Sequence, residues 1–329
     1  MGPATISPMH LIIPYAASQR LPGPEALASL QLPHLQALLA VLQRQQVVQD
    51  SHETPLHMPH ERLQAQALGW GHELTALPWA AWHQAQQGHT STQSQAWMTP
   101  CHWQVGMDQV VMLDPASLLL SDDESQQLLQ AMQPFLQEDG LQVSWHSALR
   151  WHVQGELLND LACASLDRVI GQNVKPWMPV GSAARPLQRL QSEMQMLLYN
   201  HPVNNARDAR RQIAINAFWL HDAGRLPVNT AATVQPLPID TAIRVPEALR
   251  PAALHGDVQA WQQAWRQLDA TAVADLLAHF NATGQATLSL CSEHTAHTYT
   301  PAPATWHQRV TRLFNKTTPA AALADLTTA

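Results

Sequence analysis

Apolar residues follow two spacings along the chain, and these predict alternating strands and helices. Short apolar runs and alternating apolar and polar positions predict strands at 10–14, 105–113, 141–145, 149–153 and 286–291. Apolar residues three or four apart predict helices at 35–48, 61–68, 80–87, 187–199, 258–280 and 306–314. Strand, helix and strand in this order predict an α/β fold.

Local signals mark where some of these elements begin and end. Ser121 and Glu124 have the capping-box spacing, which predicts a helix from there to about residue 136. Gly69 is expected to end the 61–68 helix, because glycine readily adopts the left-handed conformation that follows a last helical turn. Residues 72–99 are rich in Gln, His, Ser and Thr, so we expect an irregular segment apart from its short helix. Residues 228–251 carry several prolines and are expected to be a connection.

Composition narrows the classes of protein that this chain can represent. It has 329 residues, 46% of them hydrophobic, which is enough apolar material for a packed core. The net charge of -7 argues against a nucleic-acid or anionic-membrane partner. No apolar run reaches the roughly 20 residues that a membrane span needs. The three cysteines lie far apart and form no disulfide framework, so we expect a cytoplasmic protein.

Arginines are concentrated in one segment of this weakly charged chain, between residues 201 and 227. Arg207, Arg210 and Arg225 lie there, whereas the whole chain has only 18 Lys and Arg. Several guanidinium groups together predict a planar, multi-donor clamp for a phosphate or a carboxylate. A helix end with solvated arginines explains the same composition, and the residues alone leave both interpretations open.

The same segment resembles part of the archaeal-type, cofactor-independent phosphoglycerate mutases, which belong to the alkaline phosphatase superfamily. The matching motifs are His-Pro-Val-Asn-x-x-Arg from 201, Asn-Ala-x-Trp from 216 and Gly-Arg-x-Pro from 224. Residues 121–137, 140–153 and 167–174 resemble the α/β insert that caps the substrate site in these mutases.

This resemblance implies a shortened alkaline phosphatase-like core with an inserted α/β cap. The core would be built from residues 1–90 and 201–329, and the cap from residues 91–200. The resemblance also implies an anion-binding set, which comprises His201, Asn204, Arg207, Arg210, Asn216 and Arg225.

The chain ends resemble the family's core less closely. Residues 11–14 resemble its first strand, after which the family places a metal-binding aspartate, but this sequence has Tyr15. Pro59-His60-Glu61 falls where the family carries Gly-Ser-Asp, whose serine is the phosphorylated nucleophile. The mutase reaction passes a phosphoryl group through a metal-activated serine. These differences, together with a short connection where the family has further strands and ligands, predict that the ancestral catalysis is lost.

Two turns near the C-terminus keep candidate metal ligands. His255-Gly256-Asp257 resembles the family's His-x-Gly-Asp ligand turn, and Glu293-His294 resembles its Asp-His pair. Histidine and carboxylate at strand ends suit Zn or Mn. One divalent ion, Mn or Zn, held by His255, Glu293 and His294 is one hypothesis, and hydrogen-bonded loop residues are the other. No further cofactor is expected.

These features favour a non-catalytic, phosphoglycerate mutase-like pseudoenzyme with a regulatory or anion-binding role and a phosphorylated small molecule as ligand. The shortened core with its mutase-like cap also resembles a bacterial group of RpfE-type regulatory proteins. An active metal-dependent mutase or phosphomonoesterase is the first alternative, with Ser51, Thr54 and Ser292 as the nearest hydroxyl groups in the sequence. A scaffold that binds a protein partner through the Trp- and Gln-rich 72–99 segment is the second.

Overall fold

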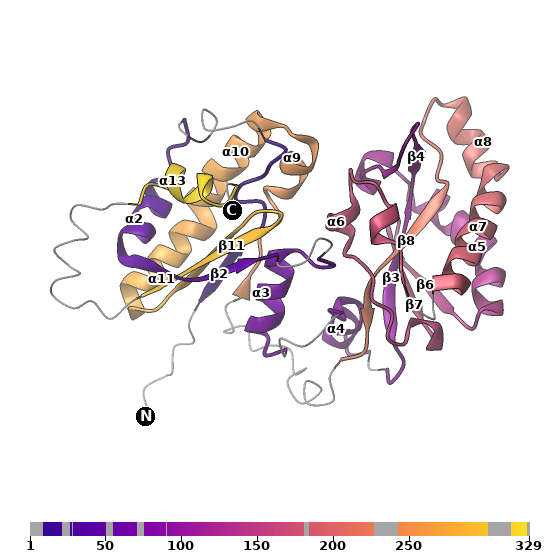
Figure 1. Ribbon diagram of the computed structural model, residues 1–329, viewed down its shortest axis with the longest axis horizontal. Coiled ribbons are helices and arrows are strands. Elements are labelled where there is room, and N and C mark those ends of the chain that lie inside the picture. Colours follow the sequence, from indigo (N-terminus) through magenta and orange to yellow (C-terminus); the bar gives the residue numbers. More distant parts are fainter. Residues whose placement is uncertain are drawn as a thin grey trace. The chain divides into compact units, whose positions relative to one another are not determined.

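The chain forms two compact units, and one of them is inserted in the other (Figure 1). Unit 1 comprises Met1–Glu53, Met58–Gly69 and Leu237–Ala329, and unit 2 comprises Thr54–His57 and Trp70–Pro236. The computed structural model describes residues 9–21, 27, 29–50, 55–70, 76–89, 91–180, 184–226, 243–301 and 317–327. Both units combine helices with a sheet, which confirms the α/β prediction. No helix in these ranges is long and apolar enough to cross a membrane.

Unit 1 is built on a mixed five-stranded sheet with the order β2-β11-β10-β1-β9. Its strands are β1 (His10–Ile13), β2 (Leu42–Gln49), β9 (Ile243–Arg244), β10 (Thr287–Cys291) and β11 (Thr295–Pro301). β1 is parallel to β10 and β9, whereas β11 is antiparallel to β10 and β2. The helices are α2 (Pro33–Val41), α3 (Pro59–Ala67), α9 (Arg250–His255), α10 (Val258–Leu268), α11 (Ala274–Thr283) and α13 (Pro319–Ala324). A π-helical turn, Asp269–Val273, joins α10 to α11.

Unit 2 is built on an antiparallel four-stranded sheet with the order β6-β7-β3-β8. Its strands are β3 (Gln95–Cys101), β6 (Gln142–Ser147), β7 (Arg150–Gln154) and β8 (Ala217–Gly224), with a separate hairpin of β4 (Trp103–Val105) and β5 (Val110–Met112). The helices are α4 (Trp79–Gln86), α5 (Asp122–Glu138), α6 (Leu166–Val169), α7 (Ala184–Tyr199) and α8 (Pro202–Ala209). Short 3-10 turns lie at Pro115–Leu118, Glu156–Leu158 and Lys175–Trp177.

The two faces of the sheet in unit 2 carry different chemistry. Side chains alternate between the faces of a strand, so Met98, Trp151 and Leu220 share one face. These three belong to the main hydrophobic cluster, together with apolar side chains of α5 and α7. Trp97 and His152 fall on the opposite face. α5, α7 and α8 lie on one side of the sheet, and α4 and α6 lie on the other (Figure 1).

Most of the expected elements are present with small shifts at their ends. These are β1, β6, β7, β10, α3, α4, α5, α7 and the helical region formed by α10 and α11. The expected cap of residues 91–200 is narrower than unit 2, because α4 and β8 also belong to that unit. The expected helix at 306–314 and most of the 228–251 connection lie outside the described residues.

Three sequence predictions were wrong. The helix expected at 35–48 ends at Val41, because the following residues pair with β11 as edge strand β2, from Leu42 opposite Pro301 to Gln49 opposite Thr295. Pairing with a neighbouring strand overrides the local helical pattern there. The strand expected at 105–113 is the β4–β5 hairpin. The segment expected to be irregular contains the start of β3, every residue of which is buried.

Polar side chains are also buried in the sheet of unit 1. The Nε2 atom of His10 lies 2.9 Å from the hydroxyl oxygen of Ser289, which lies 2.8 Å from that of Thr298. Burial lowers the pKa of His10 from its ordinary value of 6.5 to about 4. The folded state therefore keeps this ring neutral at pH values where a solvated histidine is protonated.

We expect acidification to destabilise the protein through His10. Between its unfolded pKa of 6.5 and its folded pKa of about 4, the unfolded chain binds the proton and the folded chain does not. The free energy of unfolding therefore decreases as the pH is lowered through this window. The loss reaches roughly 3 kcal/mol when the pH equals the folded pKa. The variant His10→Gln can still hydrogen-bond Ser289 but binds no proton, so it should lose less stability on acidification.

Urea unfolding at about pH 7 and about pH 4.5 measures this difference. His255→Gln is the matched control, because His255 is an exposed histidine of the same unit. The same loss of stability in His10→Gln and in the wild type would contradict the assignment.

Candidate functional site

The arginine-rich segment begins with a capped helix. His201 is the N-cap of α8, and its Nδ1 atom accepts a hydrogen bond from the backbone N–H of Val203 at 3.2 Å. Pro202 occupies the first turn of the helix, where its missing N–H costs nothing. Burial lowers the pKa of His201, which favours the neutral ring that this hydrogen bond requires. The ring nitrogen that faces the helix is therefore engaged in capping.

Two asparagine side chains of the expected anion site bridge backbone segments. The amide nitrogen of Asn204 donates to the carbonyl oxygens of Leu198 and Ile215, each at 2.8 Å, and its oxygen accepts from the N–H of Ile215 at 2.9 Å. Asn216 accepts from the N–H of Trp103 at 2.7 Å and donates to the carbonyl of the same residue at 3.0 Å. Both amides thus hold backbone segments together.

Arg207 is a fully buried guanidinium with protein acceptors for three of its nitrogens. Nε donates to the carbonyl of Ile213 at 2.8 Å, and Nη2 donates to that of Leu118 at 2.5 Å. Nη1 donates to the carboxylate of Glu124 at 2.9 Å. A buried charge needs such a partner, because removal from water is costly for each ion. The carboxylate that Arg207 holds belongs to the protein itself.

Glu124 connects this segment to α5. Its carboxylate accepts from the N–H of Ser121 at 3.1 Å, the N–H of Glu124 donates to the Ser121 hydroxyl at 3.2 Å, and these two bonds form the capping box expected from the sequence. Arg210 also donates to this carboxylate. Burial by itself raises the pKa of Glu124, but the Ser121 hydrogen bonds, Arg207 and Arg210 together outweigh burial and lower it. The carboxylate therefore stays charged and holds α5 and α8 together.

Arg225 takes no part in these hydrogen bonds. It follows β8 directly and is exposed. Four of the six expected anion-binding residues form structural hydrogen bonds around α8. Asn216 lies just before β8, and exposed Arg225 lies just after it. Binding of an external anion by this set stays a prediction.

The other expected site lies in unit 1, beyond the C-terminal ends of the parallel strands β1 and β10. Ligands of open α/β sheets bind at this edge. Tyr15 follows β1, is buried, and has a positive φ of 54°. The carbonyls of Tyr15 and Ala16 accept the indole N–H groups of Trp261 at 3.0 Å and Trp265 at 3.1 Å. The Tyr15 ring centroid lies 6.2 Å from that of His60, so this strand end is a packed aromatic corner.

Carboxylates near this corner have partners within the chain. Glu293 accepts from the hydroxyl of Ser18 and from the N–H of Gln19. The Nδ1 atom of His294 lies 3.2 Å from one carboxylate oxygen of Asp50, and Arg62 donates to the other at 2.9 Å. One hydrogen-bonded carboxylate, Glu293, and one ion-paired carboxylate, Asp50, therefore lie in the region to which the resemblance assigns metal ligands.

The turn at His255-Gly256-Asp257 has a structural explanation in helix capping. His255 ends α9, and its Nδ1 atom donates to the carbonyl of Pro251 at 2.7 Å. Gly256 has a φ of 67°, and a Cβ atom there would lie 3.2 Å from the carbonyl oxygen of Arg20. Asp257 accepts from the N–H of Ala260 at 2.9 Å and is the N-cap of α10. Glycine and aspartate at these positions are the residues that two consecutive helices require.

Within the described residues, no group of three or more His, Cys, Asp or Glu side chains is placed so that it could hold a metal ion. His255, Glu293 and His294 therefore do not come together as the expected ligand set, because each takes part in the local contacts given above.

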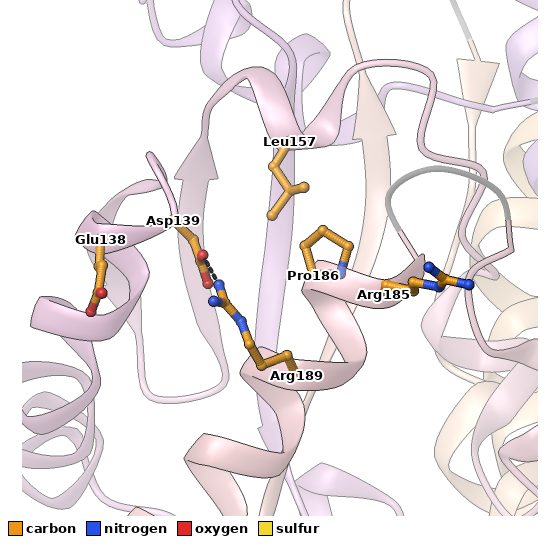
Figure 2. A pocket seen from close by; sticks show the side chains of 6 residues that line it. All are labelled: Glu138, Asp139, Leu157, Arg185, Pro186 and Arg189. Atoms are coloured by element: carbon orange, nitrogen blue, oxygen red, sulfur yellow. Dashed lines mark hydrogen bonds and ion pairs between the residues drawn. The ribbon is translucent and has the colours of Figure 1, made fainter.

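A separate hollow of about 670 Å³ lies on the surface of unit 2 between the end of α5 and the start of α7 (Figure 2). Its lining residues are Glu138, Asp139, Leu157, Arg185, Pro186 and Arg189. Arg189 points to Asp139 and donates to its carboxylate, whereas Arg185 points away from this pair. The hollow is open to solvent, and the arginine that faces the acidic side chains is ion-paired.

Comparisons with known proteins identify only distant structural neighbours. No protein-family model and no curated protein matches the chain. A cofactor-independent phosphoglycerate mutase from Thermoplasma acidophilum matches with a TM-score of 0.38 and 12% identity, over 96% of this chain and 94% of that chain. The PH0037 protein from Pyrococcus horikoshii matches with a TM-score of 0.43 and 10% identity, over 92% and 90% respectively. At these values neither neighbour assigns a family or an activity to this chain.

The sequence did not identify Glu124 as the partner of the arginines. Its capping-box spacing with Ser121 revealed its local role, but Arg207 lies 83 positions further along the chain. No short-range pattern indicates a pair at that separation. The cluster of histidines around Trp97 in unit 2, described below, was also missed, because its members come from three different elements.

Arg207 is fully buried and Arg210 is exposed, although both bind the carboxylate of Glu124. Substituting each in turn therefore compares a buried ion pair with an exposed one. Arg207→Met removes the buried cationic partner of Glu124 and the donor to the carbonyls of Leu118 and Ile213, so it should lower the free energy of unfolding by about 3–5 kcal/mol. Arg210→Met removes an exposed partner and should cost less than about 1 kcal/mol. Urea unfolding of both variants measures the difference.

The double variant Arg207→Met/Glu124→Gln tests the cause if Arg207→Met is too unstable to study. It also removes the carboxylate charge that has lost its buried partner, so it should be more stable than Arg207→Met alone. Equal and small effects of the two arginine substitutions would show that the buried pair does not hold unit 2 together.

Proposed function

We propose that this protein is a non-catalytic, phosphoglycerate mutase-like protein that has a regulatory role and binds a phosphorylated small molecule. The observation that carries the proposal is the side-chain chemistry at the end of β1. The sequence resemblance gives this position to a metal-binding aspartate, and here Tyr15 is only 2% exposed and its ring lies beside that of His60. A buried phenol supplies no carboxylate at the position where the resemblance places a metal ligand.

The position of the family's nucleophile supports the same proposal. His60 stands in place of the serine and is buried. The carboxylate of Glu61 accepts from the N–H of Met58 at 2.7 Å and so caps α3. Nearby hydroxyl groups are also engaged, because Ser18 donates to Glu293, and Ser292 donates to the carbonyl of Leu326 at 2.9 Å. Phosphoryl transfer through a serine needs a hydroxyl that is accessible and activated.

The binding part of the proposal rests on the sequence resemblance of residues 201–227 and on the exposed guanidinium of Arg225. The regulatory part rests on the resemblance to RpfE-type proteins. A cytoplasmic location fits the three cysteines, which are free and buried. Burial raises the pKa of the Cys163 thiol to about 12, so it is not poised for oxidation.

The tryptophans of the 72–99 segment favour a ligand-binding role over a protein scaffold. Trp79 packs against Trp70 and Trp82, with ring centroids 4.5 Å and 5.7 Å apart. Trp97 is buried in β3. These rings pack within unit 2, where they stabilise its structure.

An activity assay tests the loss of catalysis. The full chain is incubated with 3-phosphoglycerate and with a chromogenic phosphomonoester, each with and without added Mn²⁺ or Zn²⁺. We expect no turnover above the rate of buffer with metal alone. Turnover that disappears in the variant His294→Ala would instead establish the active, metal-dependent phosphomutase or phosphatase.

A thermal-shift titration tests binding independently of turnover. We expect 3-phosphoglycerate to raise the melting temperature increasingly with concentration, because a ligand that binds only the folded state stabilises it by mass action. Glycerate at matched ionic strength is the control, since it has the same carbon skeleton without the phosphate. Equal effects of the two compounds would contradict a phosphate-directed site.

A further inference from the structure

The face of the unit 2 sheet opposite its hydrophobic core carries a cluster of nitrogen-bearing side chains. Trp97 lies at its centre, in β3, and only 2% of it is exposed. In the sheet, Trp97 is paired with His152 of β7 on one side and with His221 of β8 on the other. All members of the cluster belong to unit 2.

Three imidazoles and one guanidinium surround the Trp97 ring. The ring centroids of His146 in β6, His83 in α4 and His152 lie 5.2, 5.4 and 5.6 Å from that of Trp97. The guanidinium carbon of Arg150, at the start of β7, lies 5.2 Å from the same centroid. His83 and His146 are themselves only 5.2 Å apart. Four groups that can donate hydrogen bonds therefore converge from three elements.

This cluster has no acidic partner among the described residues. None of the ion pairs found there involves Arg150, His83, His146 or His152. Arg150 is exposed at the start of β7, and the three imidazoles are half-buried. An anion that binds at the cluster would therefore meet the permanent charge of Arg150 without a competing carboxylate from the described residues.

Hydrogen bonding in the cluster is also incomplete. The Nε2 atom of His152 lies 2.7 Å from the side-chain oxygen of Gln95. The Nδ1 atom of His83 is buried and has no hydrogen-bond partner within the described residues. This nitrogen is one of several such atoms among the described residues, so it supports a ligand site only together with the arrangement of the whole cluster.

The protonation behaviour of the cluster fits a site that lacks an anion. Burial, then Arg150 and His146, lower the pKa of His83. Burial, then His146, His89 and His83, lower the pKa of His152 to about 4. On the remaining neighbouring strand, β8, His221 is paired with Asp222 at 2.9 Å. A bound dianion would offset the mutual repulsion of these imidazoles and raise both pKa values.

We propose that Arg150, His83, His146 and His152 form a binding site for a tetrahedral dianion, as presented by a phosphomonoester. The proposal rests on the proposed function and assigns its ligand to a specific place in unit 2. Arg150, held over the Trp97 ring, can still donate through the edge of its planar guanidinium. The imidazoles supply further donors around the same point.

Two other ligand classes fit the cluster less well. A divalent metal ion would be repelled by the permanent charge of Arg150, and the described residues contain no metal-binding group. An aromatic ligand would need a free face of Trp97 on which to stack, but this ring is buried among the three imidazoles and Arg150. A small anion requires only the outward edges of the donors.

Calorimetric titration of the full chain with 3-phosphoglycerate, and separately with sulfate, tests the site. Arg150→Gln should weaken the binding of both probes by about tenfold or more, because it removes a charge-assisted pair of hydrogen bonds. His146→Gln should weaken binding by a smaller factor. Arg150→Lys keeps the charge but not the planar fork, so its affinity should lie between those of Arg150→Gln and the wild type.

Lys175→Gln is the control variant, because Lys175 is an exposed cation of unit 2 outside the cluster. It should bind both probes as the wild type does. Thermal unfolding of each variant shows whether the variant is folded under the conditions of the titration. A loss of affinity that results from unfolding is thereby recognised.

The pH dependence of sulfate binding provides a second measurement. Sulfate stays a dianion between about pH 5.5 and about pH 8, so a change in its affinity reports on the protein. Since the bound dianion raises the pKa of His83 and His152, affinity should increase as the pH falls and binding should take up protons. In the variant Arg150→Gln, the affinity for sulfate should also increase as the pH falls, but it should be lower than that of the wild type at each pH.

The possible results test the proposed binding site and the proposed function separately. If the wild type binds 3-phosphoglycerate, but Arg150→Gln and His146→Gln bind it equally well, the site proposed here is wrong and the proposed function stands. Loss of binding in Arg225→Gln, with Arg150→Gln unaffected, would place the anion at the end of β8. If the wild type binds neither probe, both proposals are wrong.

Discussion

The burial of one guanidinium determines much of the organisation of unit 2. Arg207 is fully buried, so its charge requires a carboxylate and its remaining donors require carbonyl groups. Glu124 supplies the carboxylate while it also caps α5, so a single side chain determines where α5 begins and where α8 packs. The carbonyls of Leu118 and Ile213 connect the segments that precede α5 and follow α8 to the same group. Arg207 and Arg210 thus bind a carboxylate of the protein itself, and binding of an external anion by the expected set stays a prediction.

Local patterns in the sequence were reliable where the interaction that forms an element is itself local. The Ser121–Glu124 capping box and the glycine that ends α3 both act within four residues, and both were predicted. Strand β2 shows the opposite case, because its polar sequence forms a strand only by pairing with β11. Strand β3 was missed because both of its faces are covered, so its polar residues are as buried as its apolar ones.

Hydrogen-bond partners explain roles of polar residues that the sequence does not indicate. Asp269 lies in the π-helical turn of unit 1, yet its carboxylate accepts from the N–H groups of His34 and Leu35 and so caps α2, more than 230 positions away. Asn204 and Asp257 likewise carry residue types that suit a ligand site, and the structure uses them for a backbone bridge and a helix cap. Residue type and spacing therefore identified polar groups correctly, but not their partners, which depend on tertiary structure.

The candidate ligand sites differ in whether their charged side chains have partners within the chain. In unit 1, the carboxylate of Glu293 accepts from the Ser18 hydroxyl, and that of Asp50 is bound by Arg62 and lies beside His294, so both carboxylates have partners within the chain. Around α8 in unit 2, Arg207 and Arg210 are balanced by Glu124. The cluster around Trp97 differs, because its donors converge on one surface where the described residues supply no carboxylate. An exposed guanidinium that no carboxylate of the described residues binds can form charge-assisted hydrogen bonds to an external anion.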